Sequence, residues 1–260
     1  MAHAQDHDFF IPNRSIWPPV SCLGIGILFF GIICFLHVTP TVIGSIMMGG
    51  GLLLALLGAI SWWRDSINEA RERGYQNVPT VLELANRYGM LFFIVSEIMF
   101  FAAFFAAFFY LGNYNISWPP ENIPSIDIHL PIINTLLLLT SGVTITWAHH
   151  AVLDGHRKTA ILTTMLTWQL GVLFLIAQAY EYMHAGFGMS GGAYGTVFYM
   201  LTGFHGFHVL VGSIMIMVLH NRLAKGDFSE KHHFYFEATA WYWHFVDVVW
   251  VGLFLFVYAL

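Results

Sequence analysis

Apolar residues in this chain run together in seven long stretches and do not alternate with polar ones. The stretches lie near residues 17–37, 41–63, 88–111, 131–153, 159–183, 193–220 and 234–259. Each has roughly the 20 residues that a helix needs to cross the hydrocarbon core of a bilayer. Backbone groups in lipid must be hydrogen-bonded within their own segment, so the stretches predict seven transmembrane α-helices. The strands of a membrane β-barrel would alternate over about ten residues, and these do not.

The positions of lysine and arginine divide the connecting segments into two sets. All ten Lys and Arg residues lie in the N-terminal tail or in the second, fourth and sixth connections. The other connections and the C-terminus have none. Cationic segments are retained on the cytoplasmic side during insertion, so this asymmetry predicts an N-terminus inside and a C-terminus outside.

The same pattern predicts how the chain is organised. It predicts a polar N-terminal tail over 1–15, a transmembrane hairpin over 16–63, a charged inner loop over 64–87 and a five-helix bundle over 88–260. Gly51, Ala55 and Ala59 recur at spacing four, which gives the second helix a face of small residues for close packing against the first. Glu69 and Arg73 lie four residues apart, so part of the charged loop is expected to be helical.

Composition leaves little room for a soluble domain. The chain is 57% hydrophobic and 10% charged, whereas soluble domains have roughly 25% charged residues. The net charge of −5 gives no basic excess for binding nucleic acid. The polar tail lacks the charged start and immediate apolar core of a cleavable signal peptide, so the first helix is expected to be a permanent anchor. No nucleotide-binding glycine loop or hydrolase motif is present, and no catalytic residue is predicted.

Glu97 is the outlying polar residue of the apolar stretches. It follows Arg87 by ten residues, about 15 Å along a helix, which places it near the middle of the bilayer. An ionised carboxylate there would be costly, so we expect Glu97 to be protonated or hydrogen-bonded across helices. Two interpretations stay open: a site that handles protons or a ligand, and a neutral carboxyl group that joins two helices.

The fourteen histidines raise the question of a metal site. Adjacent histidines point about 100° apart on a helix and cannot chelate one ion together, which applies to the pairs His149–His150 and His232–His233. His205 and His208 share a face, but a site would need further ligands from other helices. We therefore predict no metal site and assign these two to packing or helix–helix hydrogen bonds. His244 and Asp247, three residues apart, are expected to lock the last helix.

Five segments together resemble one family, subunit III of haem–copper cytochrome c oxidases. The segments are RYGMLFFIVSE around Glu97, LLLLTSGVTITWAHHA at 136–151, QAYEY at 178–182, GFHGFHVLVG at 203–212 and HHFYFEATAWYWHFVDVVW at 232–250. WWRD at 62–65 matches the end of the family's second helix. The resemblance runs from about residue 14 to the C-terminus, and the first hairpin favours cytochrome c oxidases over quinol oxidases.

The resemblance implies a non-redox accessory subunit. Such a subunit binds no haem or copper, packs beside subunit I, and belongs with subunits I and II to a complex that receives electrons from cytochrome c, reduces O2 to water and pumps protons. Phospholipids fill a cleft between its hairpin and its bundle. The subunit is thought to keep proton uptake fast and to protect subunit I during turnover. A bacterial inner (plasma) membrane is the expected location, with the mitochondrial inner membrane as the alternative.

The resemblance also assigns residues. Glu97 matches the intramembrane carboxyl group, and the lipid-contact positions correspond to Trp62, Trp63, Glu69, Arg222 and Lys225. Histidines near the inner surface titrate near neutral pH and could buffer protons, or they are only solvated; they include His149, His150, His232 and His233. The alternative functions are an accessory subunit of a quinol oxidase or nitric oxide reductase and, from another class, a stand-alone transporter.

Overall fold

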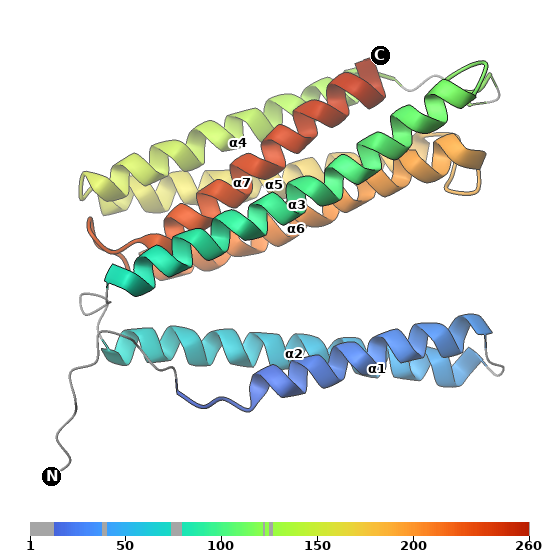
Figure 1. The fold of residues 1–260 in the computed structure, drawn as a ribbon. Coiled ribbons are helices and arrows are strands. Elements are labelled where there is room, and N and C mark those ends of the chain that lie inside the picture. Colours follow the sequence, from blue (N-terminus) through green and yellow to red (C-terminus); the bar gives the residue numbers. More distant parts are fainter. Residues whose placement is uncertain (1–12, 38–40, 74–79, 122, 125–126, 260) are drawn as a thin grey trace, which may run out of the picture. The chain divides into compact units, whose positions relative to one another are not determined.

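A computed structural model describes residues 13–37, 41–73, 80–121, 123–124 and 127–259. Within these residues the chain has helices and no strands (Figure 1). The helices are α1 (Trp17–His37), α2 (Thr41–Arg73), α3 (Thr80–Tyr114), α4 (His129–Leu153), α5 (Arg157–His184), α6 (Gly192–Lys225), α7 (Phe234–Leu253) and a terminal π-helix, η1 (Phe254–Ala259). Seven are long and apolar enough to span a membrane. The predicted all-α membrane class is confirmed, and the predicted orientation of the N-terminus stays a prediction.

The helices run past the apolar stretches that predicted them. The segment 64–87, expected as a charged inner loop, is helical through Arg73 and again from Thr80. Once a helix has formed, each added residue gains a backbone hydrogen bond, and charged side chains that extend into water do not oppose this. Hydropathy therefore marks where lipid ends and not where the helix ends. Residues 1–12 of the predicted tail and 74–79 of the predicted loop lie outside the described residues.

The chain forms two compact units, Met1–Leu82 and Glu83–Leu260. The division falls inside the charged segment that the sequence analysis placed between a hairpin and a bundle. The first unit holds α1, α2 and the first residues of α3, and the second holds the rest of α3, α4 to α7 and η1.

In the first unit, α1 and α2 pack backbone against backbone. A Cβ atom added to Gly51 would lie 2.4 Å from the backbone nitrogen of Leu28, and one added to Gly24 would lie 2.4 Å from that of Ala55. Such close approach is possible only for glycine. Gly51 and Ala55 of the predicted small-residue face thus both lie against α1. The buried glycines of α2 add a second pattern, at spacing seven: they are Gly44, Gly51 and Gly58.

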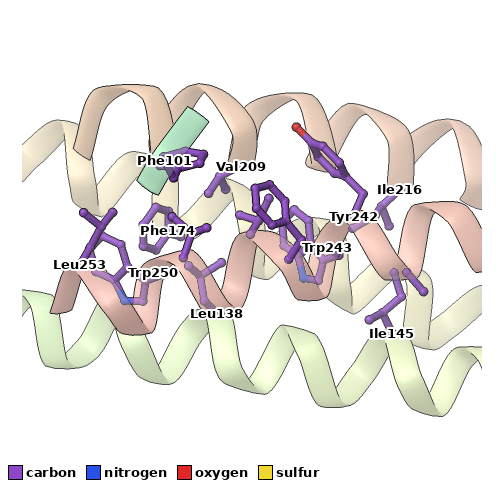
Figure 2. Close-up of a cluster of buried hydrophobic side chains, with 14 of the residues drawn as sticks. Phe101, Leu138, Ile145, Phe174, Val209, Ile216, Tyr242, Trp243, Trp250 and Leu253 are labelled. Atoms are coloured by element: carbon purple, nitrogen blue, oxygen red, sulfur yellow. The ribbon is translucent and has the colours of Figure 1, made fainter. Parts of the chain in front are cut away.

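In the second unit, one tryptophan of α7 contacts three other helices. Trp243 is fully buried (Figure 2), and its Nε1 donates a 2.8 Å hydrogen bond to Ser141 Oγ on α4. A Cβ atom added to Gly171 on α5 or Gly212 on α6 would lie 2.7 Å from its ring. The indole therefore fills a space that both glycines leave open. Phe101 of α3 joins the same core.

We expect Gly51→Ala to destabilise the hairpin, because the new methyl group collides with the α1 backbone. Overpacking of this kind costs about 1–3 kcal/mol, against a gain in helix propensity of roughly 1 kcal/mol. The neighbouring Gly50 has nothing within 4 Å of an added Cβ, so Gly50→Ala is the matched control. The measurement is the temperature at which the purified full chain loses half of its monodisperse chromatographic peak. Equal temperatures for the two variants would contradict the described packing.

Candidate functional site

Glu97 of α3 pairs with His208 of α6. The distance from Glu97 Oε2 to His208 Nε2 is 2.9 Å, and the second ring nitrogen, Nδ1, lies 2.6 Å from the carbonyl oxygen of Phe204. The sequence places these residues 111 positions apart. The bond is the hydrogen bond across helices that we expected of Glu97, and it joins α3 to the rest of the bundle.

The two hydrogen-bond contacts of His208 fix how many protons Glu97 and His208 hold together. A carbonyl oxygen only accepts, so His208 Nδ1 must carry a hydrogen. The contact between Nε2 and the carboxyl group then needs one more proton, held either by Glu97 as a carboxylic acid or by His208 as an imidazolium. The pair is neutral overall in both forms, which avoids an uncompensated charge at this depth. Chemically, the site can hold a proton and pass it between two atoms without a change in net charge.

Aromatic rings hold the imidazole of this pair in place. Phe101 meets the His208 ring edge-on at a centroid distance of 5.0 Å, and Tyr242 stacks on it at 6.3 Å. The His208 side chain is 9% exposed, whereas that of Glu97 is 22% exposed. The carboxyl group is therefore the accessible member of the pair, and the imidazole is the one fixed in the interior.

A second polar cluster gathers at the end of the bundle that holds its lysines and arginines. Arg87 of α3 binds Glu237 of α7 through two parallel hydrogen bonds, of 2.9 and 3.0 Å. His232 Nδ1 lies 2.8 Å from Glu83 Oε1 on α3. Arg157 of α5 donates to the backbone carbonyls near the C-terminus of α6, where a cation also complements the helix dipole. The cluster therefore joins α3 to α7 and α5 to α6.

The chain is similar to known proteins along nearly its whole length. The sequence profile of the family described as cytochrome c oxidase subunit III matches residues 7–260. The chain is 42% identical over 267 residues to cytochrome c oxidase subunit 3 of Dugong dugon, with 99% of this chain and 98% of that protein covered. The protein of the same name from Pylaiella littoralis is 46% identical over 260 residues, with 98% and 94% covered. The chain belongs to the cytochrome c oxidase subunit III family. A further relative, from Prototheca wickerhamii, is 44% identical over 267 residues, with 98% of each chain covered.

The lipid-contact positions that the subunit III family implies differ in their surroundings. Trp62 and Trp63 of α2 are 43% and 60% exposed, and Lys225 at the end of α6 is exposed. Glu69 accepts a 2.8 Å hydrogen bond from the backbone of Asn13. Arg222 is 11% exposed, lies 3.3 Å from Asp227, and stacks on two aromatic rings. The lipid role of all five stays a prediction, and Arg222 already has protein partners.

His205 and His208 lie on one side of α6 but face different neighbours. His205 is fully buried, 3.3 Å from the carbonyl oxygen of Val246 on α7, and lies edge-on to Phe174. His208 instead turns toward Glu97 on α3. Both imidazoles therefore join helices, which is the packing role that we assigned to them.

His244 and Asp247 belong to the contact between α7 and α4. His244 Nε2 lies 3.1 Å from Thr146 Oγ1 on α4, and its Nδ1 lies 3.7 Å from Asp247 Oδ2. These residues and His150 line a groove between the two helices whose other walls are mostly apolar. The cross-helix bond from His244 fits the locking role expected for this pair.

A buried polar network near the other end of the bundle was not predicted from the sequence. QAYEY contributes to the resemblance, and Glu181 within it was expected to be reached by water and to need no special role. Tyr258 of η1 donates a 2.6 Å hydrogen bond to Glu181, Gln178 lies 3.3 Å from the same oxygen, and Asn134 of α4 donates to Gln178 at 3.3 Å. Glu181 is 7% exposed. The spacing of Gln178 and Glu181, three residues apart in an apolar run, is the signal that could have marked them.

We expect an apolar carbodiimide to react with Glu97, because this reagent needs a protonated carboxyl group that it can reach from lipid. Replacing His208 with Leu removes the hydrogen-bond partner that the carboxyl group has among the described residues, so labelling should persist and become faster. Peptide mapping of the labelled chain by mass spectrometry is the measurement, and Glu97→Gln is the control that should abolish the label. An unlabelled Glu97 in both the wild type and His208→Leu would mean that the carboxyl group is ionised or sealed from lipid.

Proposed function

We propose that this chain is a non-redox accessory subunit of a proton-pumping cytochrome c oxidase. It packs beside subunits I and II, binds phospholipid, and supports proton uptake and the stability of subunit I during reduction of O2 to water. Haem and copper, in this proposal, reside in the partner subunits. The observation that carries the proposal is the match to the cytochrome c oxidase subunit III family over residues 7–260.

The way the bundle uses its polar groups supports an accessory role. The buried histidines of α6 are held between helices by hydrogen bonds and aromatic rings. Trp243 and Trp250 donate to side chains of α4. These groups fix the helices of the bundle relative to one another. Such rigidity suits a subunit that presents a fixed surface to its partner subunits and does not rearrange around a substrate.

The exposed aromatic and cationic residues support binding of anionic lipid. Trp62 and Trp63 come just before the charged end of α2, a position typical of interfacial aromatic residues. Lysines near a membrane surface attract anionic headgroups by about 1 kcal/mol each. The predicted host membrane, a bacterial one and not a mitochondrial one, stays a prediction that the neighbouring genes would test.

Removal of this subunit from the purified complex tests the proposed function. We expect the haem absorption spectrum to stay unchanged, because the cofactors lie elsewhere. Activity should decline faster with the number of turnovers, and proton uptake should slow. The measurements are the spectrum, the turnover number before half of the activity is lost, and stopped-flow proton uptake. An unchanged lifetime and unchanged proton uptake would reject the proposed role, and a lost haem band would place a haem in this chain.

Lys225→Ala tests the lipid sites. We expect it to lower the amount of anionic phospholipid that copurifies with the complex, because the exposed ammonium group attracts headgroups. Lys225→Arg keeps the charge and is the matched control. Arg222→Ala should mainly lower thermal stability, because its guanidinium group is held by Asp227 and two rings. Lipid phosphorus per complex is the measurement, and the same lipid content in the wild type and Lys225→Ala would argue against Lys225 as a contact.

A further inference from the structure

Three side chains of types that can bind a metal ion meet at the cationic end of the bundle. His149 lies near the C-terminal end of α4, His233 directly precedes α7, and Glu237 lies in the first turn of α7. One ligand atom of each lies within 4.8 Å of the other two, and no other group of this kind occurs among the described residues. The two imidazole rings are 5.3 Å apart between centroids.

The hydrogen bond that His233 makes through one ring nitrogen decides what its other ring nitrogen presents to Glu237. Its Nδ1 lies 3.1 Å from the carbonyl oxygen of Ser229, which only accepts, so Nδ1 carries a hydrogen. Its Nε2 then lies 3.3 Å from Glu237 Oε1. In the neutral ring, Nε2 has only a lone pair, which would repel the carboxylate oxygen unless a cation lay between them.

His149 adds a nitrogen that has no hydrogen-bond partner in the described part of the chain. Its Nε2 is buried and has no hydrogen-bond partner among the described residues. The ring is held by stacking on Phe236, with a centroid distance of 5.2 Å and an interplanar angle of 17°. A buried polar nitrogen without a partner is costly, and the imidazole that carries it also has a ligand atom within 4.8 Å of those of the two other members of the cluster.

We propose that His149, His233 and Glu237 bind one divalent cation of the zinc class. Two imidazoles and a carboxylate are a known zinc donor set, with water in the fourth position of a tetrahedron. Imidazole nitrogen selects zinc, copper or nickel over magnesium and calcium, which prefer oxygen. Bond lengths of about 2.0–2.2 Å place two ligand atoms of a tetrahedral site roughly 3.3–3.6 Å apart. His233 Nε2 and Glu237 Oε1 already have this separation, so His149 is the ligand whose side chain has to rotate closer. The site goes beyond the proposed accessory function and does not depend on it.

The surroundings of the cluster orient two of its ligands. The carbonyl group of Ser229 sets the tautomer of His233, as outer partners do for most metal-bound histidines. Arg87 fixes the Glu237 carboxylate but also places a positive charge beside the site. Glu83, bound to His232, supplies a second carboxylate nearby. A bound cation joins the end of α4 to the start of α7, next to the contact that Arg87 makes between α3 and α7.

Zinc binding to the detergent-solubilised complex that contains the full chain tests the proposal. Equilibrium dialysis against Zn²⁺ should show about one equivalent fewer bound by His149→Ala or His233→Ala than by the wild type. His150→Ala, which changes an exposed neighbour outside the cluster, is the matched control and should bind as the wild type does. Equal stoichiometry in the wild type, His149→Ala and His233→Ala would overturn the proposal, as would a loss seen with His150→Ala alone.

Two further measurements keep the test decisive if an alanine variant does not assemble. Arg87→Gln should bind Zn²⁺ more tightly, by on the order of tenfold, because one positive charge beside the ion is removed. A merely structural role of the cluster would not produce tighter binding. Anomalous scattering at the zinc edge from Zn²⁺-soaked wild-type crystals needs no variant. A peak between the three side chains supports the site, and peaks only elsewhere reject it.

Discussion

A polar side chain in hydrocarbon has no water to bind, so its partner must lie on a neighbouring helix. In the second unit this requirement produces the contacts that fix the helices. Glu97 finds His208 across α3 and α6, and the indole nitrogen of Trp243 finds Ser141 across α7 and α4. Lipid tails are as apolar as leucine, so apolar burial alone gives such helices little reason to associate. Polar pairs and close packing supply the specificity that the hydrophobic effect provides in water.

The first unit meets the same physical situation by close packing of its two helices. Its two helices approach until the glycines of one touch the backbone of the other. Dispersion forces between closely packed backbones then hold the hairpin. Large apolar side chains, among them Phe29, Leu53 and Ile46, are left exposed on its outer faces. The hairpin therefore has little interior of its own, whereas the bundle encloses Trp243 and Trp250 completely.

Much of the fold follows from the sequence because hydropathy is a local property. Seven apolar stretches suffice to count and order the helices, and Glu97 stands out by its depth alone. The partner of Glu97 could not be predicted, because His208 is 111 positions away and local spacing carries no information on which helices adjoin. The same limit applies to His149 and His233. Spacing along one helix ruled out each adjacent pair as a chelate, and only the meeting of α4 and α7 brings one member of each pair together.

Arginines and lysines at the cationic end of the bundle lie in different surroundings. During insertion, arginine and lysine act alike as signals for the cytoplasmic side. In the folded bundle they differ: Arg87 and Arg157 make forked or paired hydrogen bonds to neighbouring helices, and Arg222 is held by an acid and two rings. The lysines of the bundle, Lys158, Lys225 and Lys231, are exposed. A planar guanidinium group with five donors suits fixed partners, whereas a flexible, strongly hydrated ammonium group suits a mobile headgroup. The arginines of the bundle therefore fasten its helices to one another, and in the proposed function the attraction of anionic lipid falls to the lysines.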